Sequence, residues 1–594
     1  MGVVDIHKDG GLFYRGRYNP TVVDAIREIP GREWNPKDLI WTFPANRESL
    51  AVVTKFRDIT VKPRVWDLIR GQEETLARAQ QAKMDEKPEP VAEMPIKDVE
   101  PFAHQIKAFN MSMSLPHLGL LHEQGCGKTL TTVAILGRRF LDGEIKRVLI
   151  VAPLSVLQVW KNEFESKADY EVEVKLLIES MVRRGERLQE FSSDGLHVAI
   201  TNYEAIWRSP FYDALMNWKA DMIIADESQR IKGISTNQSK GMHRLSKNTR
   251  YTLEWQNKNR AIEKIVNNGQ PYRMILTGTP VTASPLDFWS QYKFLDPNVF
   301  GGSYYAFARR YAVYGGYEGR EIIGYQHKDE LVQKAHSIAH RVSKMDALDL
   351  PPETNQELYC ELEPQAMKTY KDMLDNNVAE IESELQDRGR LVATNVLTRL
   401  LRLQQITGGF IPRSDTDGEI VKVSDAKLNL LKETLTDLLV AGHKVVIFAR
   451  FIPEIYEIKR MLEQPFKDVG QVDFGCIYGA VPYEERNANV ARFQSDPDCR
   501  VFLAQIQTAG LGITLHAADK SILYSLDFNY ANYDQCKARL HRIGQEKNVT
   551  HIHLLAKNTV DNSVYGVLKQ KKSMADDVVD NWRKYLSGID AEST

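Results

Sequence analysis

A glycine-rich loop followed by a lysine and a threonine is the first segment of this sequence that could do chemistry. The segment LLHEQGCGKTLTTVAIL (120–136) passes from an apolar run through Gly125 and Gly127 into a helical pattern. Such a loop turns its backbone N–H groups towards an anion, and the N-terminus of the following helix strengthens the attraction. Lys128 is placed to reach the β- and γ-phosphates of a nucleotide, and Thr129 is placed to hold Mg²⁺. The segment therefore predicts a site for ATP and Mg²⁺.

The loop departs from the general phosphate-binding pattern at one position. His122 stands where the pattern G-x-x-x-x-G-K-[ST] places its first glycine. We expect the His122 side chain to pack within the loop rather than to act as a catalyst. The residues predicted to surround the nucleotide are His122, Glu123, Gln124, Gly125, Cys126, Gly127, Lys128 and Thr129.

A strand that ends in two acids supplies the second half of such a site. The segment DMIIADESQ (221–229) delivers Asp226 and Glu227 at the end of an apolar run, about 100 residues after the loop. Asp226 would bind Mg²⁺ directly or through water, and Glu227 would orient and deprotonate the attacking water. Apolar strands that end in acids are common, so the prediction depends on their combination with the loop.

Two arginines near the C-terminal end could complete the chemistry. The segment QCKARLHRIGQ (535–545) contains Arg539 and Arg542, which would share one face if they lie on a helix. Two planar, permanently charged guanidinium groups suit a transferring γ-phosphoryl group. An arginine placed in this way contributes on the order of 10³–10⁵ in rate. The alternative is a pair of solvated surface arginines.

Parallel sheets are the elements that could hold these residues together. From residue 100 onward, short β-branched runs alternate with helical patterns, which indicates sheets covered by helices on both faces. This alternation of strand and helix patterns stops between about 283 and 425, where the spacing of apolar residues is helical. We therefore predict an α/β fold with two lobes and a mainly helical insertion between them. The predicted strands are 147–153, 197–201, 221–227, 273–280, 444–450, 472–479, 500–507, 521–526 and 550–556.

The composition limits the class of protein. Hydrophobic residues make up 43% and charged residues 26% of the 594 residues, a balance typical of soluble globular proteins. No apolar stretch reaches the roughly 18–20 residues that a membrane-spanning helix needs, and the N-terminus does not resemble a signal peptide. The five scattered cysteines favour a reducing compartment without disulfides or structural zinc. We expect a cytoplasmic, nucleoid-associated protein in a bacterial or viral setting, or a nuclear one in a eukaryote.

In their order, these motifs resemble the SWI/SNF-type ATPases of helicase superfamily 2 over about 100–575. PFAHQ resembles the adenine-reading Q motif with Gln105 as the reader, and LTGTP (276–280) resembles the segment that couples hydrolysis to the DNA track. AGLGITL followed by HRIGQ is diagnostic of this family. The resemblance implies two RecA-like lobes in a monomeric, ATP- and Mg²⁺-dependent motor that moves along duplex DNA. The chain departs from the family at Gln229, where a histidine is usual; glutamine can donate and accept hydrogen bonds but carries no charge.

The resemblance also places two residues near the DNA path. Thr508 lies in the second lobe, and Trp289 follows LTGTP. For Trp289 the alternative is packing in the core, where large aromatic side chains commonly lie.

The N-terminal segment RGRYNPTVVDAIREIPGREWNPKDLIWTFP (15–44) predicts a small α+β domain. An Asn-Pro start precedes a helix whose apolar residues lie on one side, namely Val22, Val23, Ile26 and Ile29. Basic residues alternate with aromatic ones, a pattern suited to gripping a nucleic-acid backbone and stacking exposed bases. The segment is similar to the HARP domain of the annealing-helicase branch, which implies a preference for forked or branched DNA. The alternative is a domain that serves only in packing.

The predicted boundaries are a HARP-like domain over 1–70, a linker over 71–99, the first lobe over 100–345, the connection and helical insertion over 346–424, and the second lobe with a C-terminal helix over 425–594. The resulting hypothesis is a duplex DNA translocase that remodels forked or branched DNA by annealing, fork reversal or branch migration, in replication, recombination or repair. A strand-separating helicase and an ATP-gated DNA-binding module with weak motor activity stay open as alternatives.

Overall fold

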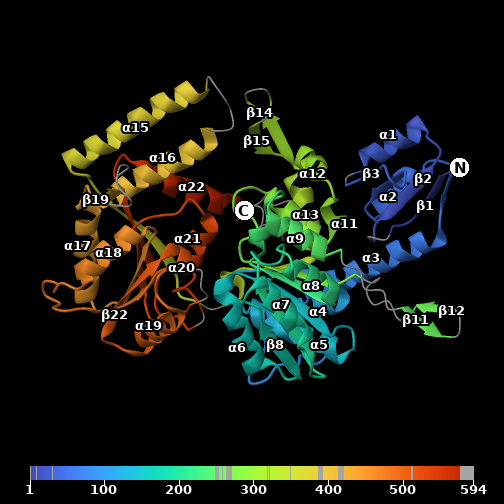
Figure 1. The fold of residues 1–594 in the computed structure, drawn as a ribbon, viewed down its shortest axis with the longest axis horizontal. Coiled ribbons are helices and arrows are strands. Elements are labelled where there is room, and N and C mark those ends of the chain that lie inside the picture. The colour runs from blue at the N-terminus through green and yellow to red at the C-terminus, as the bar shows by residue number, and fades with distance from the viewer. Residues whose placement is uncertain are drawn as a thin grey trace. The chain divides into compact units, whose positions relative to one another are not determined.

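The computed structural model covers the whole chain and divides it into two units, Met1–Ala347 and Leu348–Ser573, which are described separately. Figure 1 shows both. The residues described are 2–7, 10–29, 31–247, 253–256, 259–262, 270–316, 319, 321–347, 350–385, 392–412, 420–509, 513–542 and 544–575. Residues 510–512 of AGLGITL, Ile543 of HRIGQ and the end of the chain from 576 lie outside them. Within the described part, no helix is long and apolar enough to cross a membrane.

The first unit contains a seven-stranded parallel sheet with the order β16-β6-β13-β10-β7-β9-β8. The central strands are almost wholly buried, as expected for a sheet with helices on both faces. All four strands predicted for this lobe are present. The strands are β6 (His117–His122), β7 (Arg147–Ala152), β8 (Val172–Leu176), β9 (Leu196–Asn202), β10 (Met222–Asp226), β13 (Tyr272–Leu276) and β16 (Ala339–Val342).

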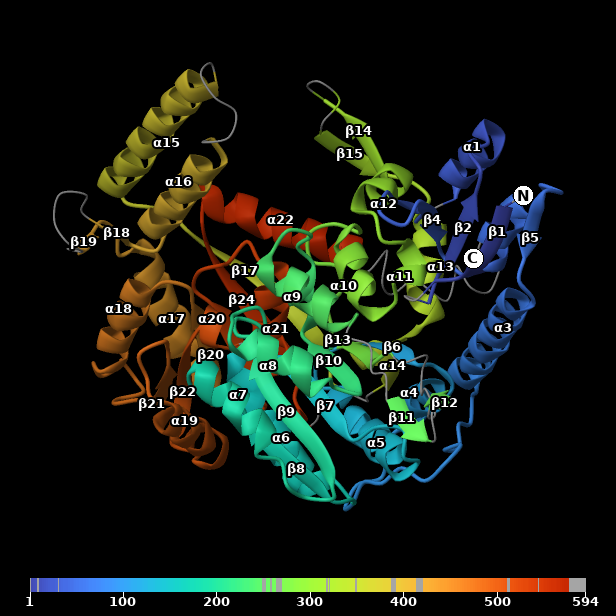
Figure 2. The same cartoon turned by 45° about the vertical axis from the view of Figure 1, so that its right-hand side comes forward.

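Helices flank this sheet in both views (Figures 1 and 2). Those between the strands are α4 (Ala103–Ser114), α5 (Lys128–Leu141), α6 (Leu157–Lys167), α7 (Met181–Gln189), α8 (Phe211–Trp218) and α9 (Asn237–Leu245). After β13 the chain forms α10 (Asp287–Leu295), α11 (Pro297–Phe300), α12 (Tyr304–Tyr311), α13 (Lys328–Ser337) and α14 (Lys344–Ala347). Two hairpins complete the unit, β11 (Leu253–Gln256) with β12 (Asn259–Ile262) and β14 (Ala312–Gly315) with β15 (Glu321–Tyr325). The β14–β15 hairpin extends outward from α12 (Figure 2).

The second unit contains a six-stranded parallel sheet with the order β17-β24-β23-β20-β22-β21. Its strands are β17 (Glu353–Cys360), β20 (Val445–Ala449), β21 (Asp473–Ile477), β22 (Cys499–Gln505), β23 (Lys520–Leu523) and β24 (Val549–Ala556). Its helices are α15 (Pro364–Leu385), α16 (Val392–Thr407), α17 (Ala426–Val440), α18 (Ile452–Leu462), α19 (Tyr483–Ser495), α20 (Ile506–Ala509), α21 (Tyr530–Lys537) and α22 (Val560–Ala575). A small hairpin joins β18 (Phe410–Pro412) to β19 (Ile420–Lys422). The five strands predicted for this lobe are confirmed, and so is the α/β fold class.

Two strands of the main sheets, besides the short hairpins β14–β15 and β18–β19, lie between 283 and 425, where the sequence predicted mainly helices. Both are edge strands: β16 pairs with β6 in the first unit, and β17 pairs with β24 along its whole length in the second. β17 reads ETNQELYC and is half-exposed, so it lacks the apolar run that reveals a central strand. β16 has only four residues. The predicted insertion over 346–424 therefore begins with a strand, continues through α15 and α16, and ends in the β18–β19 hairpin.

The N-terminal domain is a five-stranded sheet with the order β3-β4-β2-β1-β5. Its elements are β1 (Gly2–Ile6), β2 (Leu12–Gly16), α1 (Pro20–Glu28), β3 (Glu33–Asn35), β4 (Ile40–Phe43), α2 (Arg47–Val53) and β5 (Ile59–Val61). The predicted helix and its buried side are present as α1, and Asn19 caps it through its side chain. Tyr14 and Phe43 belong to the core, whereas Tyr18 and Trp34 are exposed. Only part of the aromatic set is therefore available to a partner.

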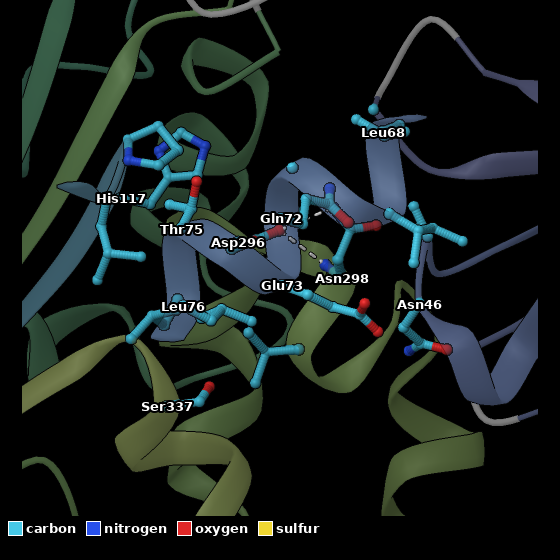
Figure 3. Close-up of a pocket in the computed structure, with 18 of the residues that line it drawn as sticks. Asn46, Leu68, Gln72, Glu73, Thr75, Leu76, His117, Asp296, Asn298 and Ser337 are labelled. Carbon is cyan, nitrogen blue, oxygen red and sulfur yellow. Dashed lines mark hydrogen bonds between the residues drawn. The ribbon is translucent and has the colours of Figure 1, made fainter. Parts of the chain in front are cut away.

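Helix α3 (Pro63–Met84) joins this domain to the first lobe. The predicted boundary at residue 71 falls inside this continuous helix. At its end, the buried Lys83 ammonium donates to the carbonyls of His336 and Ala339, both at 3.0 Å. A cavity of about 710 Å³ lies between α3 and the lobe, where Thr75 faces His117 and Asp296 bonds to Asn298 (Figure 3).

Candidate nucleotide site

The phosphate loop connects β6 to α5 and has a backbone that only glycine adopts easily. Gly125 and Gly127 have φ angles of 90° and 71°, in the left-handed region. A Cβ atom on Gly127 would lie 2.2 Å from the Gln105 side-chain nitrogen. The two glycines therefore permit both the turn and the close approach of α4 to the loop.

Lys128 begins α5 and folds back over the loop. Its ammonium donates to the carbonyl of His122 at 2.8 Å and to that of Glu123 at 3.2 Å. Thr129 follows in the first turn and is partly exposed. The loop thus presents a cation and a hydroxyl at a helix N-terminus, the arrangement predicted for phosphate and Mg²⁺.

The predicted adenine-reading segment braces this loop. Gln105 is 2% exposed; its side-chain oxygen accepts from the Phe102 amide, and its nitrogen donates to the Gly127 carbonyl at 3.3 Å. The His104 ring lies 3.0 Å from the Cys126 carbonyl oxygen. These contacts position the loop from outside, and adenine recognition by Gln105 stays a prediction.

The loop side chains point in different directions. His122 is fully buried, and its Nε2 lies 2.9 Å from Nδ1 of His340 in β16, so its side chain packs against that edge strand. Burial and the neighbouring His340 lower the pKa of His122 well below its usual value. Cys126 is also buried, which raises the pKa of its thiol to about 11. Glu123 accepts from the Arg341 guanidinium at 3.0 Å.

The two acids lie at the carboxyl end of β10. One oxygen of Asp226 accepts from the Trp160 indole at 2.8 Å, and the other accepts from the Glu227 amide at 2.9 Å. Burial and the neighbouring Glu227 raise the pKa of Asp226 to about 6, while the Trp160 hydrogen bond and then the charge of Lys128 oppose this effect. Lys128 therefore lies within electrostatic reach of Asp226. A carboxylate and the Thr129 hydroxyl are hard oxygen donors that suit Mg²⁺ held together with nucleotide phosphates.

Gln229 joins the acids to the segment after β13. Its nitrogen donates to the Glu227 carboxylate at 2.7 Å, and its oxygen accepts from the Thr277 hydroxyl at 2.7 Å. Glu227 itself has a φ of 52°, an uncommon value for a residue with a side chain. The glutamine therefore both donates and accepts, and its acceptor bond reaches Thr277 of the LTGTP segment.

Helix α10 is the second connection between these segments. The Ser228 hydroxyl donates to the Gln291 side-chain oxygen at 2.7 Å, and the Gln291 nitrogen donates to the Pro280 carbonyl at 2.8 Å. Gln291 is fully buried, so these bonds form away from water. No spacing signal in the sequence predicted this contact.

The arginine pair lies in the second unit, but not on a helix. α21 ends at Lys537, so the prediction that Arg539 and Arg542 share a helical face is wrong. The two guanidinium groups nevertheless converge, since both donate to the Ile513 carbonyl, at 3.5 and 3.4 Å. A turn after α21 therefore brings the two guanidinium groups together, which is the arrangement that the predicted helix would have produced.

A buried ionic cluster holds this turn. Glu353, the first residue of β17, forms an ion pair with Lys537, and its other oxygen lies 3.2 Å from Nδ1 of His541. The far nitrogen of His541 lies 2.9 Å from the Pro351 carbonyl oxygen. Burial favours a protonated Glu353, but the hydrogen bond with His541 and the charge of Lys537 outweigh it and lower the pKa of Glu353 far below its usual value. The cluster thus connects the start of β17 to the arginine turn.

The two residues predicted near DNA have different surroundings. Trp289 is 4% exposed, donates from its indole to the Gly301 carbonyl at 3.1 Å and packs edge-on against Tyr304. Its ring therefore lies in the core and has no face for a base, which corrects the prediction of a DNA contact. Thr508 is partly exposed in α20, and its hydroxyl donates to the Gln505 carbonyl at 2.8 Å. A role of Thr508 in DNA binding stays a prediction.

Comparison with known families finds two matches. The SNF2-related domain matches residues 104–254 and 255–408, which together make up more than half of the chain. The helicase conserved C-terminal domain matches residues 426–544.

Among curated proteins, "Chromodomain-helicase-DNA-binding protein 1-like" of Danio rerio is 28% identical over 476 residues, covering 78% of this chain and 42% of that protein. An "Uncharacterized ATP-dependent helicase" of Mycoplasma pneumoniae is 26% identical, covering 77% of this chain and 39% of that protein. The chain thus spans less than half the length of these relatives. The solved "Sulfolobus solfataricus SWI2/SNF2 ATPase core in complex with dsDNA" is 25% identical, covers 84% of this chain and 97% of that one, and superposes with a TM-score of 0.37.

Proposed function

Because the chain belongs to the SNF2-related family, we propose that it is a DNA-dependent ATPase that moves along duplex DNA. One observation carries the proposal: a phosphate loop, a pair of acids and Thr277 lie at the carboxyl ends of neighbouring strands of one sheet, and hydrogen bonds through Gln229 join Glu227 to Thr277. Loops at this edge of a parallel sheet are where α/β proteins bind nucleotides. The arginine pair lies in the second lobe.

The residues divide the chemistry of ATP hydrolysis among them. Lys128 neutralises the phosphates, and Asp226 with Thr129 holds Mg²⁺, which stabilises charge on the phosphates when bound. Glu227 takes a proton from the attacking water, and the hydrogen bond from Gln229 orients its carboxylate. Arg539 and Arg542 stabilise the transferring phosphoryl group.

We further propose that the motor remodels forked or branched DNA during replication, recombination or repair. The support is the N-terminal domain, which resembles a HARP domain and has exposed Tyr18 and Trp34 near exposed arginines. Such a surface grips a backbone and stacks unpaired bases. A relative is named as a helicase and DNA-binding protein, which supports a DNA substrate.

The decisive experiment measures ATP turnover without DNA, with single-stranded DNA, with blunt duplex and with a fork. We expect duplex and fork to stimulate turnover in the wild type and to have no effect on Lys128→Ala, which lacks the cation of the loop. Equal turnover under all four conditions in the wild type would contradict a motor on DNA.

The fork preference is tested by removing residues 1–62, which leaves helix α3 whole. We expect stimulation by blunt duplex to persist and the additional stimulation by the fork to disappear. Annealing and unwinding of labelled forks then distinguish a rewinding translocase from a strand-separating helicase.

A further inference from the structure

A basic groove lies where the N-terminal domain meets the first lobe. It has a volume of about 570 Å³ and runs between α1 and α2 on one side and α11 and α12 on the other. Figure 2 shows the two parts side by side. The groove is lined by the basic residues Arg27, Arg32, Arg309, Arg310 and Lys334 and by the acids Glu28 and Glu48. Its positive excess indicates an anionic occupant.

In the described part of the chain, two of these arginines lack a carboxylate partner. Arg310 and Lys334 bind Glu330, and Arg27 binds Asp24. Among the described residues, no carboxylate lies within ion-pair distance of Arg32 or Arg309, and Arg309 is exposed. One of these two cations comes from each wall of the groove, so an anion between the walls could contact both.

An exposed aromatic ring lies beside the cations. Tyr305 is 79% exposed, and its ring packs edge-on against Tyr304 at 6.1 Å, which leaves a face of the ring open. Tyr304 in turn packs against the buried Trp289. A ring supported from behind and open in front is a stacking platform for a nucleobase.

The walls of the groove are held together by backbone contact. Gly31 and Gly301 have φ angles of 81° and 79°, and a Cβ atom on Gly301 would lie 2.1 Å from the Cα atom of Gly31. Behind Gly301, Trp289 binds its carbonyl, and Lys293 donates to the carbonyl of Gly302 at 2.9 Å. Both side chains come from α10, the helix whose Gln291 bonds to Ser228 beside the acids. The groove is therefore connected through one helix to the nucleotide site.

We propose that this groove binds single-stranded DNA, namely the unpaired arm of a fork. Arginines that grip phosphates beside a stacking tyrosine suit a strand whose bases are exposed, whereas a duplex exposes base faces only at its ends. Naming the occupant as a fork arm depends on the proposed function, but the binding of single-stranded DNA does not.

The test uses the full-length chain and fluorescence anisotropy with three labelled DNAs: oligothymidine, a fork with oligothymidine arms, and a blunt duplex. We expect R32A/R309A to weaken binding of oligothymidine and of the fork about tenfold and to leave the blunt duplex unaffected. The slope of log affinity against log salt for oligothymidine should fall by about 1.4, the value for two lost phosphate contacts. Tyr305→Ala should weaken the same two ligands, and Tyr305→Phe, which keeps the ring, should not.

Arg57→Ala is the matched control, because Arg57 is an exposed arginine of the same domain that does not line the groove. Wild-type affinity of R32A/R309A and of Tyr305→Ala for oligothymidine and fork would overturn the proposal. An equal loss of affinity in Arg57→Ala would also overturn the proposal, because it would show that the affinity depends on the overall positive charge of the domain rather than on the groove. ATP turnover stimulated by blunt duplex, measured on the same proteins, tests the proposed function separately.

Discussion

The Gln229 side chain accepts a hydrogen bond from the Thr277 hydroxyl at 2.7 Å and donates one to Glu227 at the same distance. The carboxylate expected to activate water is thus connected, through one amide, to the segment that follows β13. Because an amide has one donating and one accepting end, it can serve two neighbours without carrying charge.

This relationship predicts the effect of removing the amide. In Gln229→Ala, the carboxylate of Glu227 loses its orienting donor, and we expect turnover to fall about tenfold or more. Thr277→Val should lower turnover in the same direction. The double variant should be little worse than Gln229→Ala, because both changes break one chain of bonds. Full additivity of the two losses would contradict the coupling, and Gln229→His, which keeps a donor, should retain most of the activity.

Binding of Mg²⁺·ATP should depend on pH through Asp226. The pKa of this carboxyl is raised to about 6 by burial and by Glu227, so acidification below that value protonates the group needed to hold Mg²⁺. We expect the affinity for Mg²⁺·ATP to fall as the pH drops below about 6. Glu227→Gln removes one cause of the raised pKa and should move the loss to lower pH. Binding of a fluorescent ATP analogue, measured with and without Mg²⁺, checks this; an identical midpoint in both proteins would count against it.

The ion pair between Glu353 and Lys537 should support both stability and turnover. In Glu353→Gln, the Lys537 ammonium stays buried without its partner charge, and we expect about 2–3 kcal/mol of destabilisation in chemical unfolding. Maximal turnover should fall as well, since the turn that carries Arg539 and Arg542 loses its anchor.

Glu361→Gln provides the matched control for that experiment. Glu361 pairs with Lys557 at 2.8 Å on the surface of the same unit. Its removal should change the stability by at most about 0.5 kcal/mol. Equal effects of the two substitutions would refute a special role for the buried cluster.

Substitution at Gly301 should separate the N-terminal domain from the first lobe. A methyl group there would overlap the Gly31 backbone, so we expect Gly301→Ala to expose the intervening surface to hydrogen exchange while basal ATP turnover persists. Gly143→Ala is a suitable control: Gly143 has a φ of 72°, but its Cβ position is open, so only the backbone strain is shared. Unchanged exchange around Arg32 in Gly301→Ala would argue against the contact.

The parts of the site that lie next to each other in sequence were predictable from the sequence. The loop around Lys128 and the acids after β10 carry their chemistry in consecutive residues, and apolar runs place them at strand ends. The sequence also predicted that Arg539 and Arg542 lie together. The predicted helix was wrong, because a turn after α21 also brings two side chains three residues apart to the same side.

The parts that depend on distant partners were not predictable. Glu353 lies in a polar edge strand, and its role is visible only once Lys537 and His541 are beside it. The Trp289 side chain lies in the core because its indole donates to the Gly301 carbonyl, twelve residues away along the chain. Sequence patterns report the period of an element, but they do not report which carbonyl an indole will reach.

The folded-back Lys128 has a consequence for which anions the loop selects. Its ammonium donates to two neutral carbonyls, so an anion must offer Lys128 a stronger acceptor than these carbonyls. An anion with a single weakly charged oxygen is little better as an acceptor for the Lys128 ammonium than the two carbonyls are. A chain of phosphates offers several charged oxygens at once, to the ammonium and to the N–H groups of the loop together. The protein should therefore discriminate steeply in favour of nucleoside triphosphates over monophosphates and small inorganic anions.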